Sequence, residues 1–280
     1  MGTGIVDYYD QCHSDYQRFW RIDKNLGFHY GFYDNGQKSH NKAVVRMNEV
    51  LALKARITSA DRVLDAGCGI GGSAIWLAKN IGCRVAGINI SDNQLGIAES
   101  LVKERQLGKL VKVYNMDFCN TEFPDSCFDV IWALESSCYA IDKLGFLKEA
   151  KRLLKENGRI VIADGFLAGG LSKPEREAVY EWLSGWGSPY LATASEFTGY
   201  LKDVGFKNIL FEDITERTMP SSRRLYRAGK VSYPLCKLLE LVGLRTKTQT
   251  RNIISAVYQY KILKCGLAKY GILTAQRKEV

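Results

Sequence analysis

The sequence predicts an α/β protein with a doubly wound sheet and a mostly helical cap. From 61 to 215, short apolar runs alternate with longer amphipathic stretches, as expected when strands and helices alternate along a chain. Between the first run and the first amphipathic stretch, Gly67, Gly69 and Gly72 form a G-x-G-x-x-G loop, which lets a ligand approach the backbone closely. Three stretches outside this alternation, 5–44, 165–190 and 216–265, are expected to form the cap.

The expected strands are short runs rich in apolar and β-branched residues. They are RVLDAG (62–67), CRVAGIN (83–89), KLVKVYN (109–115), FDVIWA (128–133), GRIVIADGF (158–166), FKNILFEDIT (206–215) and GLAKYGILTAQRK (266–278). The expected helices are 73–81, 92–106, 143–158 and 193–205. The last two end at glycines, Gly158 and Gly205, that suit a helix C-cap.

These elements divide the 280 residues into four parts. An aromatic-rich leader, 1–60, is expected to form a lid over a cofactor. The α/β core, 61–215, is expected to bind that cofactor. A basic helical insertion, 216–265, forms the cap, and 266–280 returns to the core as its last strand.

The positive charge of the chain is concentrated in one segment. The net charge is +9, but 217–264 alone holds eleven Lys or Arg and a single acid, Glu240, so this segment carries +10 and the rest of the chain −1. The segment could contact an anionic membrane surface or bind a phosphate-bearing acceptor. The third alternative is a solvated basic face, which is the usual explanation of a charge run.

The cysteines and the hydropathy of the chain indicate the cellular compartment in which the protein is expected. The eight cysteines form no C-x-x-C pair, and the three histidines show no metal-ligand spacing with them, so no metal site is expected. Scattered thiols are typical of a reducing compartment, which favours a cytoplasmic protein, with peripheral membrane contact as an addition. No signal peptide and no membrane-spanning segment are expected.

Two residues near the glycine loop favour a cationic cofactor over a dinucleotide. Asp65 lies two residues before Gly67, where its charge would repel a pyrophosphate. At the end of the second strand, where an NAD enzyme uses Asp or Glu to bind the ribose, this chain has Asn89.

Four segments then carry a resemblance: VLDAGCGIGGSAIWLA (63–78), GINISDNQLGIA (87–98), MDF (116–118) and FDVIWALES (128–136). They resemble class I methyltransferases that use S-adenosylmethionine, and the resemblance covers about 60 to 215. It implies a seven-stranded Rossmann-like sheet. For cofactor binding it implies Asp65, Gly67 and Gly69 around the methionine and ribose, Asn89, Ile90 and Gln94 near the ribose, and Asp117 with Phe118 at the adenine. Asn89 is similar to the neutral polar residue of the sterol and tocopherol methyltransferase branch, whereas Asp117 could instead be a turn former.

The candidate catalytic residues follow the fourth strand and lie in the leader. ALESSCYA (133–140) and the leader segments YYD (8–10) and LGFHYGFYD (26–34) resemble sterol C-methyltransferases. Methylating an alkene leaves a carbocation, which aromatic faces stabilise and a carboxylate can deprotonate. The candidates for these tasks are Glu135, His29, Tyr30 and Tyr139. Alternatively, Glu135 only accepts hydrogen bonds from backbone amides or the ligand's amino group, and His29 only packs.

The function that the sequence favours is methyl transfer from S-adenosylmethionine to a lipophilic small molecule, terpenoid- or sterol-like, with carbon as the favoured atom. The main alternative is an N- or O-methyltransferase of a small amine or phenolic metabolite. A binding module without activity and an RNA methyltransferase are less favoured. No proline stands in the motifs of base-modifying enzymes, so no nucleic-acid partner is expected.

Overall fold

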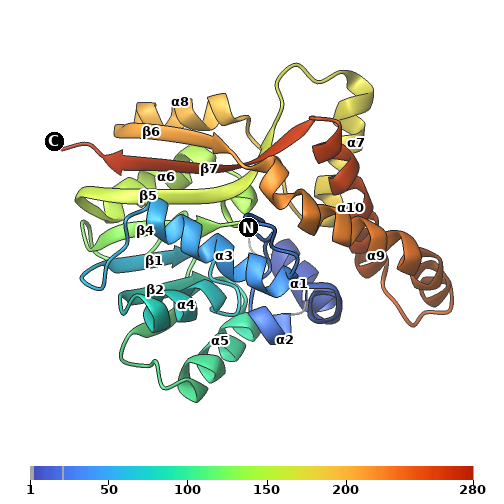
Figure 1. Cartoon of the computed structure of the whole chain (residues 1–280), viewed down its shortest axis with the longest axis horizontal. Coiled ribbons are helices and arrows are strands. Elements are labelled where there is room, and N and C mark those ends of the chain that lie inside the picture. The colour runs from blue at the N-terminus through green and yellow to red at the C-terminus, as the bar shows by residue number, and fades with distance from the viewer. Residues whose placement is uncertain (1–2, 21, 280) are drawn as a thin grey trace.

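The fold is built on one seven-stranded sheet, seen in a computed structural model that describes residues 3–20 and 22–279. The strand order is β3-β2-β1-β4-β5-β7-β6 (Figure 1). The strands are β1 (Arg62–Ala66), β2 (Arg84–Asn89), β3 (Val111–Asn115), β4 (Phe128–Leu134), β5 (Leu154–Leu167), β6 (Phe206–Asp213) and β7 (Ala268–Arg277). Their order confirms the predicted doubly wound sheet.

The direction of the strands determines where a ligand can bind. β1 to β5 are parallel, and β7 lies antiparallel between β5 and β6. Along the chain, the sheet grows from β1 to one side through β2 and β3 and then to the other side through β4 and β5. Open α/β sheets bind ligands at the carboxyl ends of the strands beside such a switch point, which here lies between β1 and β4.

Helices cover both faces of the sheet (Figure 1). One face is covered by α3 (His40–Lys54), α4 (Gly72–Asn80) and α5 (Asp92–Glu104), and the other by α6 (Lys143–Leu153) and α8 (Ala194–Val204). Alternate residues of each strand face opposite sides, so Val130 and Trp132 enter one apolar core while Ile131 and Ala133 enter the other. Gly205 ends α8 in the left-handed conformation, with φ 94°, as predicted.

The helix expected over 143–158 is shorter than predicted, and the glycine stop assigned to it is wrong. α6 ends at Leu153, and Leu154 already belongs to β5, fully buried and paired with Phe128 of β4. A Cβ on Gly158 would lie 2.8 Å from the carbonyl oxygen of Lys155. Gly158 therefore makes room for a tight turn within β5, while pairing with β4 ends the helix earlier.

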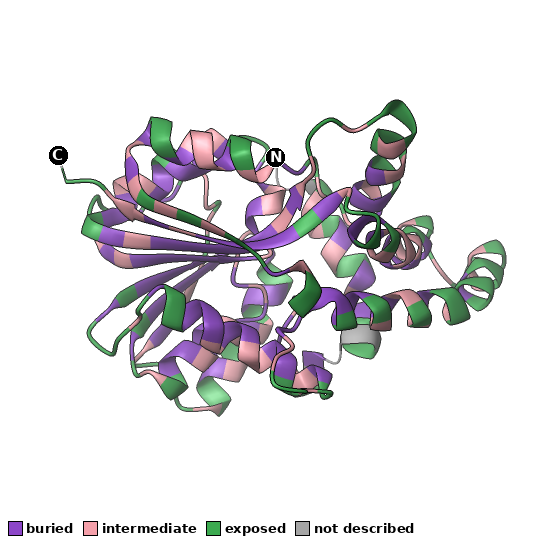
Figure 2. Ribbon diagram, turned by 45° about the horizontal axis from the view of Figure 1, so that its top comes forward, coloured by how far each residue is buried: buried purple, intermediate pink, exposed green. Residues whose placement is uncertain are grey.

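The remaining helices gather beyond the carboxyl ends of the strands. The leader holds α1 (Thr3–Asp15), a π-helical turn η1 (Tyr16–Trp20) and α2 (Ile22–Asn25). The other helices are α7 (Lys173–Gly185), α9 (Thr215–Leu241) and α10 (Lys247–Lys264). α9 and α10 pack together as a hairpin, and α10 also packs against α7 and α1. The far end of this hairpin extends away from the sheet and is mostly exposed (Figures 1 and 2).

Across residues 3–20 and 22–279, no helix is both long and apolar enough to cross a bilayer.

Candidate active site

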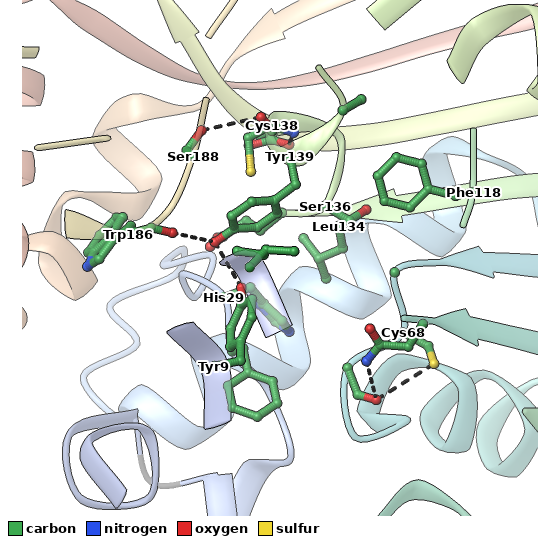
Figure 3. Close-up of a pocket in the computed structure, with 18 of the residues that line it drawn as sticks. Tyr9, His29, Cys68, Phe118, Leu134, Ser136, Cys138, Tyr139, Trp186 and Ser188 are labelled. Atoms are coloured by element: carbon green, nitrogen blue, oxygen red, sulfur yellow. Dashed lines mark hydrogen bonds between the residues drawn. The ribbon is translucent and has the colours of Figure 1, made fainter. Parts of the chain in front are cut away.

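A cavity of about 360 Å³ lies at the switch point, between the strand ends and the leader. All the site residues predicted from the sequence line it. They are His29, Tyr30, Asp65, Gly67, Gly69, Asn89, Ile90, Gln94, Asp117, Phe118, Glu135 and Tyr139. In Figure 3, Phe118 and Cys68 lie on one side of Tyr139 and Trp186 lies on the other, so the cavity has a glycine-loop end and an aromatic end.

The glycines of the loop are needed by the chain as well as by any ligand. A Cβ on Gly67 would lie 2.5 Å from Cβ of Ser136, and one on Gly72 would lie 2.1 Å from the carbonyl oxygen of Leu26. One on Gly69 would contact the ring of a second leader residue, Phe28, at 3.1 Å. The leader therefore lies directly against the loop, a contact that the motif alone does not predict.

Asp65 is a buried carboxylate with an unused acceptor. It is 2% exposed, and within the described chain its Oδ2 has no hydrogen-bond partner. Burial raises its pKa to about 7, although a hydrogen bond from the amide of Ala74 acts in the opposite direction. An ammonium group in the cavity would donate a hydrogen bond to Oδ2 of Asp65 and would also balance the negative charge of the carboxylate. The orphaned oxygen and the close backbone of the glycine loop therefore fit the amino acid portion of S-adenosylmethionine.

Asn89 is held by its own loop. Its Nδ2 donates to Oε1 of Gln94 at 2.6 Å and to the carbonyl of Gly69 at 3.3 Å, while its Oδ1 accepts from the amide of Ile90 at 2.8 Å. The amide therefore ties β2 to the glycine loop and to α5. Its predicted ribose contact stays a prediction.

Asp117 and Phe118 lie beside each other at the rim of this end. Oδ1 of Asp117 accepts from the amide of Cys119 at 2.8 Å, so the turn-forming role left open by the sequence is present. The side chain also lines the cavity, so the turn and a ligand contact are compatible. The ring of Phe118 stands edge-on to that of Phe146, with the centroids 5.3 Å apart.

Glu135 follows β4 in a strained, left-handed conformation with φ 50°, which turns its side chain back toward the leader. Its Oε1 accepts from the amide of Tyr30 and from the hydroxyl of Tyr270, both at 2.7 Å. Burial raises the pKa of Glu135 to about 8, against the lowering effect of these two hydrogen bonds.

Tyr30 and His29 support the site from the leader. Tyr30 contacts Glu135 through its backbone amide, whereas its hydroxyl donates to Oε1 of Gln259 in α10 at 2.7 Å. Nδ1 of His29 lies 3.0 Å from the carbonyl of Tyr30, which only accepts, so the proton of the neutral ring is on Nδ1. Burial lowers the pKa of His29 to about 4, which keeps the ring neutral at physiological pH.

Tyr139 belongs to a chain of aromatic residues at the far end of the cavity. The hydroxyl of Tyr9 donates to that of Tyr139 at 2.9 Å, which in turn donates to the carbonyl of Trp186 at 3.3 Å (Figure 3). Burial raises the pKa of both phenols, so both stay protonated. The rings of Tyr16 and Phe28 pack 5.1 Å apart beside them. This end offers aromatic faces with few free polar groups.

Sequence reasoning missed three residues that hold the site. Tyr270 of β7 binds Glu135 directly, and Asp164 of β5 accepts from the hydroxyl of Ser137 at 2.7 Å and the amide of Cys138 at 2.8 Å. Lys143 is 2% exposed and donates to backbone carbonyls of the same loop. The sequence does contain an indication of Asp164, because it is an acidic residue at the end of an apolar strand. No sequence pattern indicates Tyr270, because its position depends on the insertion of β7 beside β5.

Comparisons with known proteins agree with this geometry. A family described as "Methyltransferase domain" matches residues 64–162. A sterol 24-C-methyltransferase from Eremothecium gossypii is 32% identical over 259 residues, which cover 90% of this chain and 69% of that protein. A chloroplastic tocopherol O-methyltransferase from Arabidopsis thaliana is 26% identical over 297 residues, covering 99% of this chain and 82% of that protein.

Among solved structures, the cyclase SpnF has a TM-score of 0.80, with 22% identity, 99% of this chain covered and 96% of that chain. At this identity the likeness concerns the fold alone, since one fold supports many reactions.

Proposed function

Since the chain belongs to the S-adenosylmethionine-dependent methyltransferases, in the family of the sterol C-methyltransferases, we propose that it methylates a lipophilic, terpenoid- or sterol-like acceptor at carbon. The family membership confirms the resemblance seen in the sequence. One observation gives the strongest support for this choice of acceptor. Glu135, a half-buried carboxyl group held by the Tyr30 amide and the Tyr270 hydroxyl, lines the same cavity as the glycine loop and the aromatic end.

The cofactor, when bound, supplies a methyl group activated by a positively charged sulfur. We assign the amino group of its methionine portion to Asp65, whose Oδ2 has no partner in the described chain, and its ribose to Asn89 and Gln94. Asp117 and Phe118 are assigned to the adenine. The leader, 1–60, would close over this end, and the contacts of Leu26 and Phe28 with the glycines support that role.

The acceptor would lie against the aromatic end, beside Tyr9, Tyr139 and Trp186. These rings favour an apolar ligand, and their faces stabilise positive charge. The two relatives described above are named for a sterol and for a tocopherol, molecules with large hydrocarbon portions. Transfer needs the two reacting atoms in line and water excluded, which a leader closed over the cavity would provide.

We assign Glu135 to receive the proton that the acceptor loses after methylation at an alkene carbon. A pKa of about 8 lies near physiological pH, the range in which a general base is most effective. A positive charge on the acceptor would lower that pKa and favour the ionised form. His29 and Tyr30 would position Glu135, because the neutral ring of His29 donates to the carbonyl of Tyr30 and the amide of Tyr30 donates to Glu135.

O-methylation of a phenolic acceptor is the second candidate, favoured by the tocopherol enzyme among the relatives. A phenol also needs a base, so Glu135 would serve both reactions. The ¹³C chemical shift of a transferred labelled methyl distinguishes a methyl bound to carbon from one bound to oxygen. The cytoplasmic location is likewise a proposal, resting on the scattered thiols.

Two variants test the assignment of roles. Glu135→Gln keeps the shape of the side chain, so we expect cofactor affinity to be nearly unchanged while turnover falls about 100-fold or more. Asp65→Ala should instead weaken cofactor binding. Affinity is measured by calorimetry, and turnover by transfer of a radioactive methyl into an organic extract of lipophilic acceptors.

An equal loss of cofactor affinity and turnover in Glu135→Gln would make Glu135 a cofactor-binding residue and contradict its proposed role. Label that stays in the aqueous small-molecule fraction, even when lipophilic acceptors are offered, would point to a polar amine instead.

A further inference from the structure

The far end of α9 has an apolar face that contacts no other part of the described chain closely. Val231, Leu235, Leu238, Leu241 and Val242 are between 57% and 83% exposed. The first three and Val242 follow one another at i, i+4, i+7 and i+11, so they form a single stripe along the helix. Scattered exposed apolar residues are common, but a contiguous stripe marks an interaction surface.

This stripe lies on the opposite side of α9 from the residues that pack against the body of the protein. Leu225, Gly229 and Cys236 are the buried positions of this part of the helix. A Cβ on Gly229 would lie 3.1 Å from Val257 of α10, so the two helices are in close contact there. At 100° per residue, the stripe is turned well away from that contact. The body of the protein therefore leaves it uncovered.

Basic residues border the stripe. Arg223, Arg227 and Lys230 are exposed on the preceding turns of α9, and Lys237 stands beside the stripe, paired with Glu240 at 2.7 Å. The residues from 217 to 264 carry a net charge of +10. An apolar stripe bordered by cations matches the interface of a membrane, where acyl chains lie beneath negatively charged headgroups.

We propose that this face of α9, which we call the α9 stripe, docks flat on the surface of an anionic lipid bilayer. Its apolar side chains enter the boundary between headgroups and acyl chains, and the flanking arginines and lysines contact lipid phosphates. From Val231 to Val242 the stripe is about 17 Å long at 1.5 Å per residue, so it lies along the surface. A second copy of this chain is the poorer occupant, since it would bring two segments of +10 together.

The α9 stripe is linked to the cavity through the leader. Arg245, in the turn after α9, binds Asp15 of α1 with its two Nη atoms, at 3.0 and 2.5 Å. The side chain of Gln249 donates to the carbonyl of Gln11 in the same helix at 2.8 Å. α1 also provides Tyr9 to the wall of the cavity. A docked hairpin would therefore hold the leader side of the cavity near the membrane. The docking itself does not depend on the identity of the acceptor.

Vesicle binding tests the proposal with the whole protein. The probes are vesicles of phosphatidylcholine alone, or of phosphatidylcholine and phosphatidylglycerol in equal parts, and bound protein is measured by flotation. We expect binding to the anionic vesicles, weak binding to the neutral ones, and a loss of binding as salt is raised. The double variant L235S/L238S should bind about tenfold less or worse, and Lys230→Gln about fivefold less.

A matched control is L53S/L210S, since Leu53 and Leu210 are 70% and 69% exposed on α3 and β6, away from the hairpin. It should bind vesicles as the unmodified protein does. The proposal fails if the unmodified protein binds neither kind of vesicle, or if L235S/L238S binds anionic vesicles as well as the control. It also fails if the protein is a dimer that L235S/L238S converts to a monomer, which would make a second copy the occupant.

Discussion

At the scale of single residues, the carboxyl group of Glu135 makes stability depend on pH. Its pKa is about 8 in the folded protein against 4.5 for the free side chain, so between these values the folded state binds more protons than the unfolded state. Stability is therefore highest below about 4.5 and falls as pH rises through about 8, by up to about 5 kcal/mol if the group stays buried. The pKa of Asp65 is raised to about 7, so this residue also makes stability fall as pH rises.

Glu135→Gln should remove the part of this dependence that Glu135 causes. Gln has no charge to bury and can still accept from Tyr30 and Tyr270 through its Oε1. We expect the melting temperature of the variant to exceed that of the unmodified protein above pH 8 and to match it near pH 4.5. Calorimetry without cofactor measures this. A difference between the two proteins that is the same at every pH would mean that Glu135 does not keep its proton in the folded state.

At the scale of elements, the leader and the glycine loop fit each other through Gly72. A Cβ there would lie 2.1 Å from the carbonyl oxygen of Leu26, so Gly72→Ala must displace the leader, at a cost of about 1–3 kcal/mol. We expect faster proteolysis of the leader and weaker cofactor binding. The control is Gly96→Ala in α5, where an added Cβ meets nothing within 4 Å and should stabilise the helix. Unchanged proteolysis of Gly72→Ala would show that the leader does not depend on this contact.

The elements also show how far the sequence could predict the structure. The strands and the glycine loop were predicted because apolar runs and glycine spacing are local properties. The end of α6 was predicted wrongly, because Leu154 pairs with Phe128 of β4, a contact between residues distant in the sequence. Likewise, motifs predicted twelve residues that line the cavity, but Tyr270 reaches Glu135 only because β7 pairs with β5.

At the scale of the whole molecule, one buried ion pair joins the leader to the cap. The side chains of Asp15 and Arg245 are 5% and 10% exposed. Removing one partner of such a pair costs about 3–5 kcal/mol, whereas an apolar replacement of both is close to neutral. We expect Asp15→Ala to lower the free energy of unfolding in urea by that amount and Asp15→Leu with Arg245→Met to restore most of it. If the double replacement is as unstable as the single one, the leader is held by other contacts.

The order of β7 in the sheet has a consequence for synthesis of the protein in the cell. The residues that line the cavity run from Ile5 to Tyr270. The aromatic leader therefore cannot pack against the complete cavity wall until α10 and β7 have been synthesised. At about 5–20 residues per second, that interval lasts on the order of tens of seconds. During it, the apolar side chains of the leader are open to chaperones, and β6 cannot join the sheet because its neighbour β7 does not yet exist.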